Sequence, residues 1–380
     1  MLSGTANSVR FAMSKFPEST TSVAETAAEA VPRRPRDLQS PSGDSLSMRG
    51  RMGTVPGFRV LATGSYVPER VVTNADLVPL GCDEEWIIRR TGIRERRHAA
   101  ANESTCDLAH EAATRCIDAS PISVDQIDLI VVATITPDDP TRSIAGELQR
   151  RLGCVAPGMD ISAACAGFTY ALTTASQFIA AGNCRNVLVV GVDVMSRTIN
   201  PKDKNTYPLF GDGAGAVLLT AEPNDRAGGI LAYQMGSEGC GKEMLYIPAG
   251  GSRQGLTPDA LAKGEQYMIM DGRNVFKWAV RVVDESIKEV LEHAAVAAEQ
   301  VNLVILHQAN QRIIDSAVSD LHLKPEAVFA NLDRYGNTSA ASIPLALDEA
   351  IKAGRVTRGE LVLLCGFGAG LVWSTALLRW

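Results

Sequence analysis

Two continuous runs of apolar residues, separated by segments with a helical pattern, constrain the fold of this chain most strongly. Residues 129–134 (Leu-Ile-Val-Val-Ala-Thr) and 186–192 (Asn-Val-Leu-Val-Val-Gly-Val) have the length of buried strands. Neither reaches the roughly 18–20 apolar residues that a membrane span needs. Helical patterns occur between such strands, at 104–117 and 145–152. Apolar strands that alternate with helices predict an α/β protein whose sheets are covered by helices on both faces.

The second part of the sequence repeats motifs of the first. Residues 127–133 (Ile-Asp-Leu-Ile-Val-Val-Ala) resemble 301–307 (Val-Asn-Leu-Val-Ile-Leu-His). Residues 211–219 resemble 366–373, because both begin with alternating glycines and continue into apolar residues. The similar spacing of these two pairs suggests a duplicated βαβ architecture. We therefore expect the functional site where the two halves meet.

The first 55 residues differ from the rest of the chain. They are rich in Ser, Ala, Pro and Arg and show no sustained apolar period, so we expect residues 1–55 to be a disordered extension. A transit peptide is an alternative, although five acidic residues are more than such peptides usually carry. A start at Met48 or Met52 is another. The duplicated halves would then span 56–225 and 226–380.

Charge and cysteine usage exclude several classes of protein. The 37 basic and 43 acidic residues give a formal net charge of −6, which argues against a nucleic-acid-binding protein. The eight cysteines lie far apart, with neither a C-x-x-C pair nor a Cys/His cluster at zinc spacing. We expect reduced thiols, no metal site, no membrane association and a cytoplasmic location.

Cys165 is the first candidate for a catalytic residue. A predicted strand ends near Ser162, and a helical pattern begins at Ala166. A helix N-terminus favours the thiolate and can lower a cysteine pKa from about 8.5. The alternative is a buried structural cysteine, and the local pattern alone does not decide between the two.

His307 and Asn337 are the next candidates. His307 follows a predicted strand at its carboxyl end, where ligand sites of α/β sheets lie. Asn337 lies in a Gly-Asn-Thr-Ser run that is typical of a turn or helix cap, but its amide could also donate to an oxyanion. Residues 366–370 (Gly-Phe-Gly-Ala-Gly) lack the Lys-Ser/Thr of a phosphate loop, so a tight turn beside an active site fits better. A lone histidine is more often structural.

From Phe58 to Trp380 the sequence resembles the β-ketoacyl-acyl carrier protein synthase III family of the thiolase superfamily. The motifs that carry the resemblance lie in order at 62–68, 83–96, 163–168, 211–216, 307–310, 336–342 and 366–370. It implies a thiolase-like fold of two duplicated βαβ halves in five layers, αβαβα.

The resemblance also implies a reaction. Cys165 would attack an acyl-CoA thioester and form an acyl-enzyme. Nε2 of His307 and the amide of Asn337 would then hydrogen-bond the thioester oxygen of malonyl-acyl carrier protein as CO2 leaves. The resulting carbanion would attack the acyl-Cys carbonyl. This is the acyltransferase reaction that initiates fatty acid synthesis, and it needs no cofactor beyond the CoA thioester substrate.

Further roles follow by position in the motifs. Trp86 would stack on the CoA adenine with Arg197 on its other face, and Arg90 and Thr91 would meet the nucleotide. Backbone N–H groups at Cys165 and in the 367–370 turn would hold the oxyanion. The remaining implied contacts are Asn310 and Phe367 to substrate, and Arg312 and Lys277 to the acidic carrier protein.

Two features depart from the family pattern. In bacterial members of the family the helix after the histidine that corresponds to His307 carries further lysines towards its end, whereas here it carries Asp315 and Asp320, which would repel an acidic carrier. Thr141 lies in segment 137–145, which in the family closes the acyl pocket of the partner in a homodimer. The acetyl-selective form has Phe at this position, so Thr141 predicts a longer or branched acyl primer.

Other functions remain open from the sequence. The first alternative is a related acyl-CoA-dependent condensing enzyme or acyltransferase of secondary metabolism. A papain-like hydrolase also uses Cys, His and Asn, but the mid-chain strand–helix position of Cys165 disfavours it. A catalytically silent acyl-binding protein is the alternative that is not an enzyme.

Overall fold

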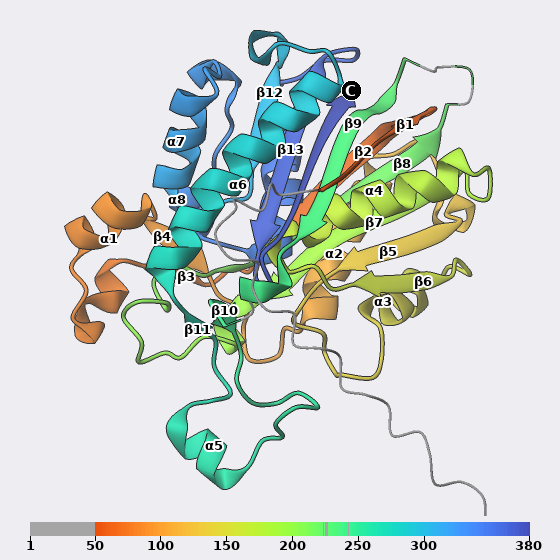
Figure 1. The fold of residues 1–380 in the computed structure, drawn as a ribbon. Coiled ribbons are helices and arrows are strands. Elements are labelled where there is room, and N and C mark those ends of the chain that lie inside the picture. The colour runs from red at the N-terminus through yellow and green to blue at the C-terminus, as the bar shows by residue number, and fades with distance from the viewer. Residues whose placement is uncertain (1–49, 223, 225–226, 242) are drawn as a thin grey trace, which may run out of the picture. The chain divides into compact units, whose positions relative to one another are not determined.

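The computed structural model describes residues 50–380 apart from 223, 225, 226 and 242. Within this part of the chain, two five-stranded sheets provide the frame (Figure 1). The first has the order β2-β8-β7-β5-β6 and consists of β2 (Phe58–Tyr66), β5 (Leu129–Ala133), β6 (Gly158–Ile161), β7 (Asn186–Val194) and β8 (Asp212–Ala221). The second has the order β1-β9-β14-β13-β12 and consists of β1 (Arg51–Pro56), β9 (Gly229–Ser237), β12 (Leu303–Leu306), β13 (Leu361–Gly368) and β14 (Val372–Arg379).

The two sheets repeat one topology. Strands β9, β14, β13 and β12 follow each other in the same order as β2, β8, β7 and β5. In both sheets the pairs at the β5 or β12 side are parallel and the others antiparallel. The counterpart of β6 is reduced to a single parallel bridge between Val304 and Val328. The common strand order thus agrees with the duplication that the short repeated motifs in the sequence suggested.

Helices form three layers around the sheets. Helices α2 (Thr105–Asp118) and α3 (Ile144–Leu152) pack on the outer face of the first sheet, and α6 (Gly272–His293) and α7 (Gln311–Asp320) on that of the second. Helices α4 (Gly167–Ala180) and α9 (Ser342–Lys352) lie between the sheets. The predicted α/β class with five αβαβα layers is confirmed.

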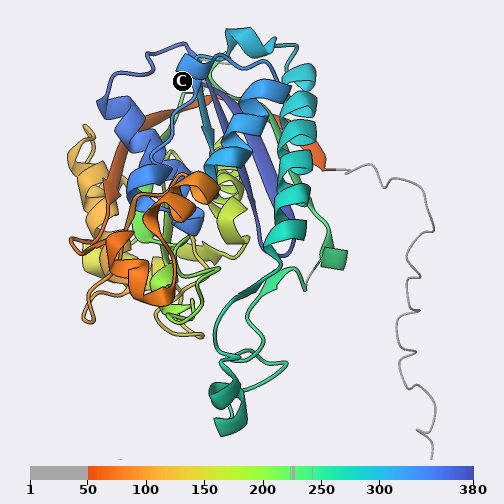
Figure 2. The same ribbon diagram turned by 90° about the vertical axis from the view of Figure 1, so that its left-hand side faces the viewer.

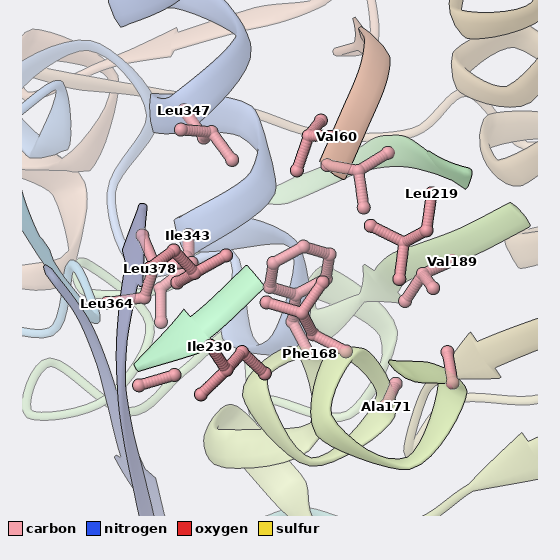
Figure 3. Packing of buried hydrophobic residues seen from close by; sticks show 14 of the residues in the cluster. Val60, Phe168, Ala171, Val189, Leu219, Ile230, Ile343, Leu347, Leu364 and Leu378 are labelled. Atoms are coloured by element: carbon pink, nitrogen blue, oxygen red, sulfur yellow. The ribbon is translucent and has the colours of Figure 1, made fainter. Parts of the chain in front are cut away.

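The central layer explains the continuous apolar strands. In Figure 3, Phe168 of α4 and Ile343 of α9 point toward side chains of both sheets, among them Val189 and Leu364. All nine residues of β7 are buried, because helices cover both faces of this strand. A strand in this position has no solvent side that would require alternating polar residues.

Smaller elements complete the fold. They are α1 (Glu84–Thr91), α5 (Pro258–Lys263), α8 (Leu332–Tyr335), and the two-stranded sheets β3 (Val71–Thr73)–β4 (Glu95–Arg97) and β10 (Leu245–Tyr246)–β11 (Ile269–Met270). Helix α5 lies on a segment that extends away from the two sheets in both views (Figures 1 and 2).

The predicted boundary of the N-terminal extension needs a correction. Residues 51–56 form β1, which pairs with β9 and buries Val55 to 1% exposure. The extension was expected to reach residue 55, since these few residues have no recognisable period of their own. Pairing with an existing edge strand orders them. Residues 1–49 lie outside the described part of the chain.

Candidate active site

Cys165 lies on a strained turn between β6 and α4. The turn η3 (Ala164–Ala166) is a short 3-10 helix, and α4 begins immediately after it at Gly167. Ala164 has a φ of +46°, in the left-handed region that residues with a side chain rarely adopt. Such strain concentrates at functional sites. The first N–H groups of α4 lack partners within the helix, so negative charge beside Cys165 is favoured.

Two glycines of β13 allow the second half to approach this turn. A Cβ on Gly368 would lie 2.6 Å from the backbone nitrogen of Cys165. A Cβ on Gly366 would lie 2.9 Å from Cα of Ala166. Both distances are too short for any side chain. The glycine-rich run 366–370 is therefore where the end of β13 contacts the turn that carries Cys165.

The protonation state of Cys165 differs from the expected one. Its thiol is 7% exposed, and burial raises its pKa to about 12, although a hydrogen bond from Sγ to Oγ of Ser339 (3.5 Å) opposes the rise. The buried carboxylate of Asp193 adds to it. The predicted lowering of the pKa is wrong for the free protein, because burial of the thiol raises the pKa instead. Cys165 is a neutral thiol.

His307 follows β12 and is held by the second half. Its backbone N–H donates to the carbonyl of Cys365 (2.8 Å), and its ring meets Phe367 edge to face, with 5.1 Å between ring centroids. Nδ1 lies 2.8 Å from Oγ of Ser342. The side chain is buried, and burial lowers its pKa to about 3. The imidazole is therefore neutral at physiological pH.

Asn337 is oriented by contacts from both halves. Its backbone pairs with residues 209–211: its N–H donates to Leu209 (2.8 Å) and its carbonyl accepts from Gly211 (3.0 Å). Its Oδ1 accepts from the backbone N–H of Ser339 (2.9 Å). Since the oxygen of the amide is occupied in this way, the Nδ2 group is left as the donor.

Ser339 connects the three candidates. It begins η8 (Ser339–Ala341), the short 3-10 helix before α9, with a φ of +53°. Its Oγ contacts Cys165, its N–H donates to Asn337, and its carbonyl accepts from Oγ of Ser342 (2.7 Å), the residue that touches His307. Sequence reasoning missed both serines. They lie within the 336–342 motif, which does not reveal their contacts.

Asp193 is a further buried residue that the sequence did not indicate. One carboxylate oxygen accepts from Oγ1 of Thr134 (3.0 Å), the N–H of Ile135 (2.8 Å) and Oγ1 of Thr136 (2.9 Å). The other accepts from the N–H of Ala340 in η8 (3.1 Å). Asp193 on β7 thus holds the turn of the second half against the first sheet.

A cavity of about 740 Å³ is lined by Cys165, His307 and Asn337 together. Its wall also contains Phe367, which packs against His307, and Trp278 of α6. The indole N–H of Trp278 is buried and has no hydrogen-bond partner among the described residues. The three candidate residues, far apart in the sequence, therefore share one site built from both halves.

The predicted CoA contacts Trp86, Arg90 and Thr91 line this cavity, as does the predicted substrate contact Asn310. Arg90 lies 5.4 Å above the Trp86 ring, measured from Cζ to the ring centroid. Asn310 donates from Nδ2 to the carbonyl of Arg90 (3.1 Å), so α7 is tied to α1. The hydroxyl of Thr91 donates to the carbonyl of Ile87 and is engaged within α1.

The prediction for Arg197 is not met by the structure. Its guanidinium donates to the carbonyls of Ala100 and Glu103, and the residue does not line the cavity. Of the two cations that follow β7, the exposed Lys204 is the one that lines the cavity with Trp86. Both residues follow β7, and the sequence alone did not show which of them faces the cavity.

Arg312 and Lys277, the predicted carrier contacts, are exposed at the cavity. They also line an adjacent surface depression with Asp315. Arg312 lies over the Phe276 ring at 5.1 Å. The acidic Asp315 therefore lies beside the two cations, while its Oδ1 accepts from Nε2 of Gln311.

Thr141 does not line the cavity of its own chain. It is exposed, and its backbone N–H and hydroxyl donate to Asp139 (2.9 and 2.8 Å). Its predicted role concerns the pocket of a partner subunit, so it stays a prediction.

Within the described ranges, no group of three or more His, Cys, Asp or Glu side chains is arranged to hold a metal. No helix of that part of the chain is long and apolar enough to cross a membrane.

Comparison with known proteins shows the family. Family models for 3-oxoacyl-[acyl-carrier-protein] synthase III and for its C-terminal part match residues 159–239 and 291–380. The chain is 63% identical over 345 residues to β-ketoacyl-[acyl-carrier-protein] synthase III of Rhodopirellula baltica, covering 87% of this chain and all of the relative.

A second relative and a solved structure extend the comparison. The Caldanaerobacter subterraneus enzyme of the same name is 44% identical, covering 84% of this chain and 97% of its own. The crystal structure of 3-oxoacyl-[acyl-carrier-protein] synthase III from Aquifex aeolicus matches with a TM-score of 0.79 at 43% identity, covering 85% of this chain and all of that one. Sequence, fold and relatives agree: the chain belongs to the β-ketoacyl-[acyl-carrier-protein] synthase III family.

Proposed function

We propose that this chain condenses an acyl-CoA primer with malonyl-acyl carrier protein and so initiates fatty acid synthesis, with Cys165, His307 and Asn337 as its catalytic residues. The observation that carries the proposal is that these three side chains line one cavity and are joined through Ser339 and Ser342. The names of the relatives favour fatty acid synthesis over the alternative in secondary metabolism.

In the first half-reaction the sulfur of Cys165 attacks the thioester carbonyl of acyl-CoA. The C–S bond to CoA breaks, and the thiol proton is transferred to the departing CoA sulfur, which leaves an acyl-enzyme and free CoA. The backbone N–H of Cys165 and the 367–370 turn hold the oxyanion of the tetrahedral intermediate. The close approach of Gly368 to the Cys165 nitrogen supports this arrangement.

In the second half-reaction malonyl-acyl carrier protein loses CO2. Nε2 of His307 and Nδ2 of Asn337 donate to its thioester oxygen as that oxygen takes on enolate charge, so no strong base is needed. The carbanion attacks the acyl-Cys carbonyl, and the thiolate of Cys165 leaves and takes up one proton from solvent. The neutral imidazole and the free amide donor suit this role.

The wall with Trp86 and Arg90 binds the nucleotide of CoA, and Lys204 takes the place proposed from the sequence for Arg197. Arg312 and Lys277 contact the carrier protein at the cavity mouth. The active unit is a cytoplasmic homodimer in which segment 137–145 of one subunit closes the acyl pocket of the other. The exposure of Thr141 supports such a role.

Mass spectrometry after incubation with a panel of acyl-CoAs tests the proposal. We expect an acyl adduct on Cys165, with medium or branched chains loaded at least as well as acetyl. Release of labelled CO2 on addition of malonyl-acyl carrier protein separates a condensing enzyme from an acyltransferase that acts on O or N nucleophiles. Acyl transfer without CO2 release contradicts the proposed reaction, and a strict acetyl preference contradicts the role of Thr141.

A further inference from the structure

Arg96 of β4 is a fully buried arginine without an acidic partner among the described residues. All four of its hydrogen bonds in that part of the chain go to neutral oxygens. Burial lowers its pKa to about 10, so the guanidinium still carries its charge at physiological pH. A buried charge without a counterion is costly, and its retention points to a task beyond packing.

The guanidinium of this residue joins three segments of the chain. Nη1 donates to the carbonyl of Val72 on β3 (3.1 Å), and both Nη1 and Nη2 donate to Oδ1 of Asn74 (2.9 Å each). The buried Asn74 in turn donates from Nδ2 to the carbonyl of Ile93 (2.9 Å), so it is a fixed acceptor. Nη2 also donates to the carbonyl of Pro208 (2.7 Å), 112 residues further along the chain. The guanidinium thus ties Pro208 to the β3–β4 sheet.

Pro208 belongs to the segment that pairs with Asn337. The carbonyl of Leu209 accepts from the N–H of Asn337 (2.8 Å), and the N–H of Gly211 donates to the carbonyl of Asn337 (3.0 Å). The carbonyls that accept from the guanidinium and from Asn337 therefore belong to consecutive residues. A shift of the first carbonyl also shifts the second, and with it the backbone of Asn337. Pro208 and Leu209 line the same cavity as Asn337.

The aliphatic part of Arg96 packs behind this pairing. A Cβ on Gly211 would lie 3.2 Å from Cβ of Arg96, and a Cβ on Gly336 would lie 3.4 Å from it. Gly211 belongs to the segment that pairs with Asn337, and Gly336 directly precedes Asn337. The stem and the guanidinium of Arg96 therefore contact the backbone on both sides of the pairing.

We propose that Arg96 is a positioning residue that fixes segment 208–211 and, through it, the backbone of Asn337. The inference rests on the proposed function, in which Nδ2 of Asn337 donates to the malonyl thioester oxygen. A donor that is fixed before the charge develops needs no reorganisation during the reaction. Arg96 itself does not touch the substrate, because it is fully buried and does not line the cavity.

The nucleophile is held by other contacts. The turn that carries Cys165 lies against Gly366 and Gly368 of β13. None of these residues accepts a hydrogen bond from Arg96. We therefore expect the loss of Arg96 to affect CO2 release far more than acyl-enzyme formation.

The test measures the two half-reactions separately. Arg96→Met keeps an aliphatic stem and removes all four hydrogen bonds. We expect CO2 release from malonyl-acyl carrier protein by the preformed acyl-enzyme to fall about 10- to 100-fold. Acyl-enzyme formation at saturating acyl-CoA should stay within about threefold. Equal losses in both half-reactions, or a larger loss of acylation, would overturn the role of Arg96.

Arg96→Lys separates the effect of the charge from that of the hydrogen bonds. Lysine keeps the positive charge but lacks the planar fork of donors. CO2 release should therefore fall by nearly the same factor as in Arg96→Met. Recovery to the wild-type rate would mean that the charge acts and the fork does not, which contradicts a positioning role.

A double variant tests whether the effect passes through Asn337. In Arg96→Met/Asn337→Ala, CO2 release should be no slower than in Asn337→Ala alone, because the group to be positioned is already absent. If the two losses multiply instead, Arg96 acts independently of Asn337 and the proposal is wrong.

Asn74→Ala and Asn186→Ala are a matched pair that separates position from stability. Both asparagines are buried, and each donates from Nδ2 to a backbone carbonyl. Oδ1 of Asn74 accepts from Arg96, whereas Oδ1 of Asn186 accepts from Thr220. A partly unfolded variant lowers both rates by one factor, so the ratio of CO2 release to acylation is the readout.

We expect this ratio to fall about three- to tenfold in Asn74→Ala and to stay unchanged in Asn186→Ala. Equal ratios in the two variants would count against the proposal. A failure of the proposed function is distinguishable, since the wild type itself would then form no adduct or release no CO2, whereas a failure of the role of Arg96 shows only in the variants.

Discussion

The turns before α4 and α9 occupy equivalent places in the two halves but carry different chemistry. Each is a three-residue 3-10 helix that leads directly into a central helix, and each has one residue with positive φ, Ala164 or Ser339. Cys165 in the first turn corresponds to Ala340 in the second.

The contacts of these turns are reciprocal. The first turn lies against Gly366 and Gly368 of β13 in the second sheet. The second turn lies against Gly191 of β7 in the first sheet, where a Cβ would lie 2.3 Å from the carbonyl oxygen of Ala340. The turn of each half thus packs against glycines in the sheet of the other half. Both halves therefore share one backbone arrangement. A few side chains give the first turn its nucleophile and let the second turn orient hydrogen-bond donors.

The largest expected loss of activity comes from giving the first turn the alanine that the second turn has at the equivalent position. Cys165→Ala should abolish the acyl adduct and lower condensation by at least about 10³-fold. The free energy of unfolding should change by no more than about 1 kcal/mol, because the other turn carries alanine at this position. Mass spectrometry and thermal unfolding measure the two effects. An adduct that persists would place the nucleophile elsewhere.

Substituting the glycines that contact the two turns tests whether the turns have separate roles. Gly368→Ala and Gly191→Ala each introduce a backbone clash, and each should destabilise the protein by about 1–3 kcal/mol. We expect Gly368→Ala to slow mainly acylation and Gly191→Ala to slow mainly CO2 release. Gly255→Ala, where no atom lies within 4 Å of the new Cβ, is the control. Identical kinetic profiles for the first two variants would contradict separate roles for the turns.

Acid stability compares a buried histidine from each half. Burial lowers the pKa of His307 to about 3 and that of His98 to about 4, both below the unfolded value of about 6.5. The unfolded chain therefore binds more protons below pH 6.5, and the free energy of unfolding falls on acidification, by up to about 1.4 kcal/mol per pH unit for each group.

Replacing either histidine should flatten this dependence between about pH 6 and 4.5. Denaturant unfolding of His307→Gln and His98→Gln at several pH values measures the slope. His293→Gln, at an exposed position, should leave it unchanged. A wild-type slope in His307→Gln would mean that the ring is not held neutral.

The smallest expected effect concerns two lysines at the cavity, one from each half. Lys204→Ala should raise KM for acyl-CoA about fivefold without changing that for malonyl-acyl carrier protein, and Lys277→Ala should do the reverse. Exposed charges contribute little individually, so kcat should change less than twofold in both variants. Steady-state kinetics with each substrate varied in turn shows whether the lysine of the first half affects mainly acyl-CoA and that of the second half mainly malonyl-acyl carrier protein.

The sequence predicted those features that depend on local pattern. Strands such as β7 were recognisable because a strand covered on both faces must be apolar throughout. Cys165, His307 and Asn337 were recognised as candidates from their motifs, and they line one cavity. Their catalytic roles remain predictions. Strand β1 was missed because its order depends on pairing with β9, some 180 residues away.

Burial and contacts between the halves were decided only by the tertiary structure. The helix terminus beside Cys165 is visible in the sequence, but the burial that raises its pKa is not. The same holds for the directions in which Arg197 and Lys204 point, and for the hydrogen bond that Ala340 of η8 donates to Asp193. Periodicity and motifs report what a residue does for its own strand or helix. The protonation and orientation of a side chain depend on neighbours that the chain brings close only when both halves have folded.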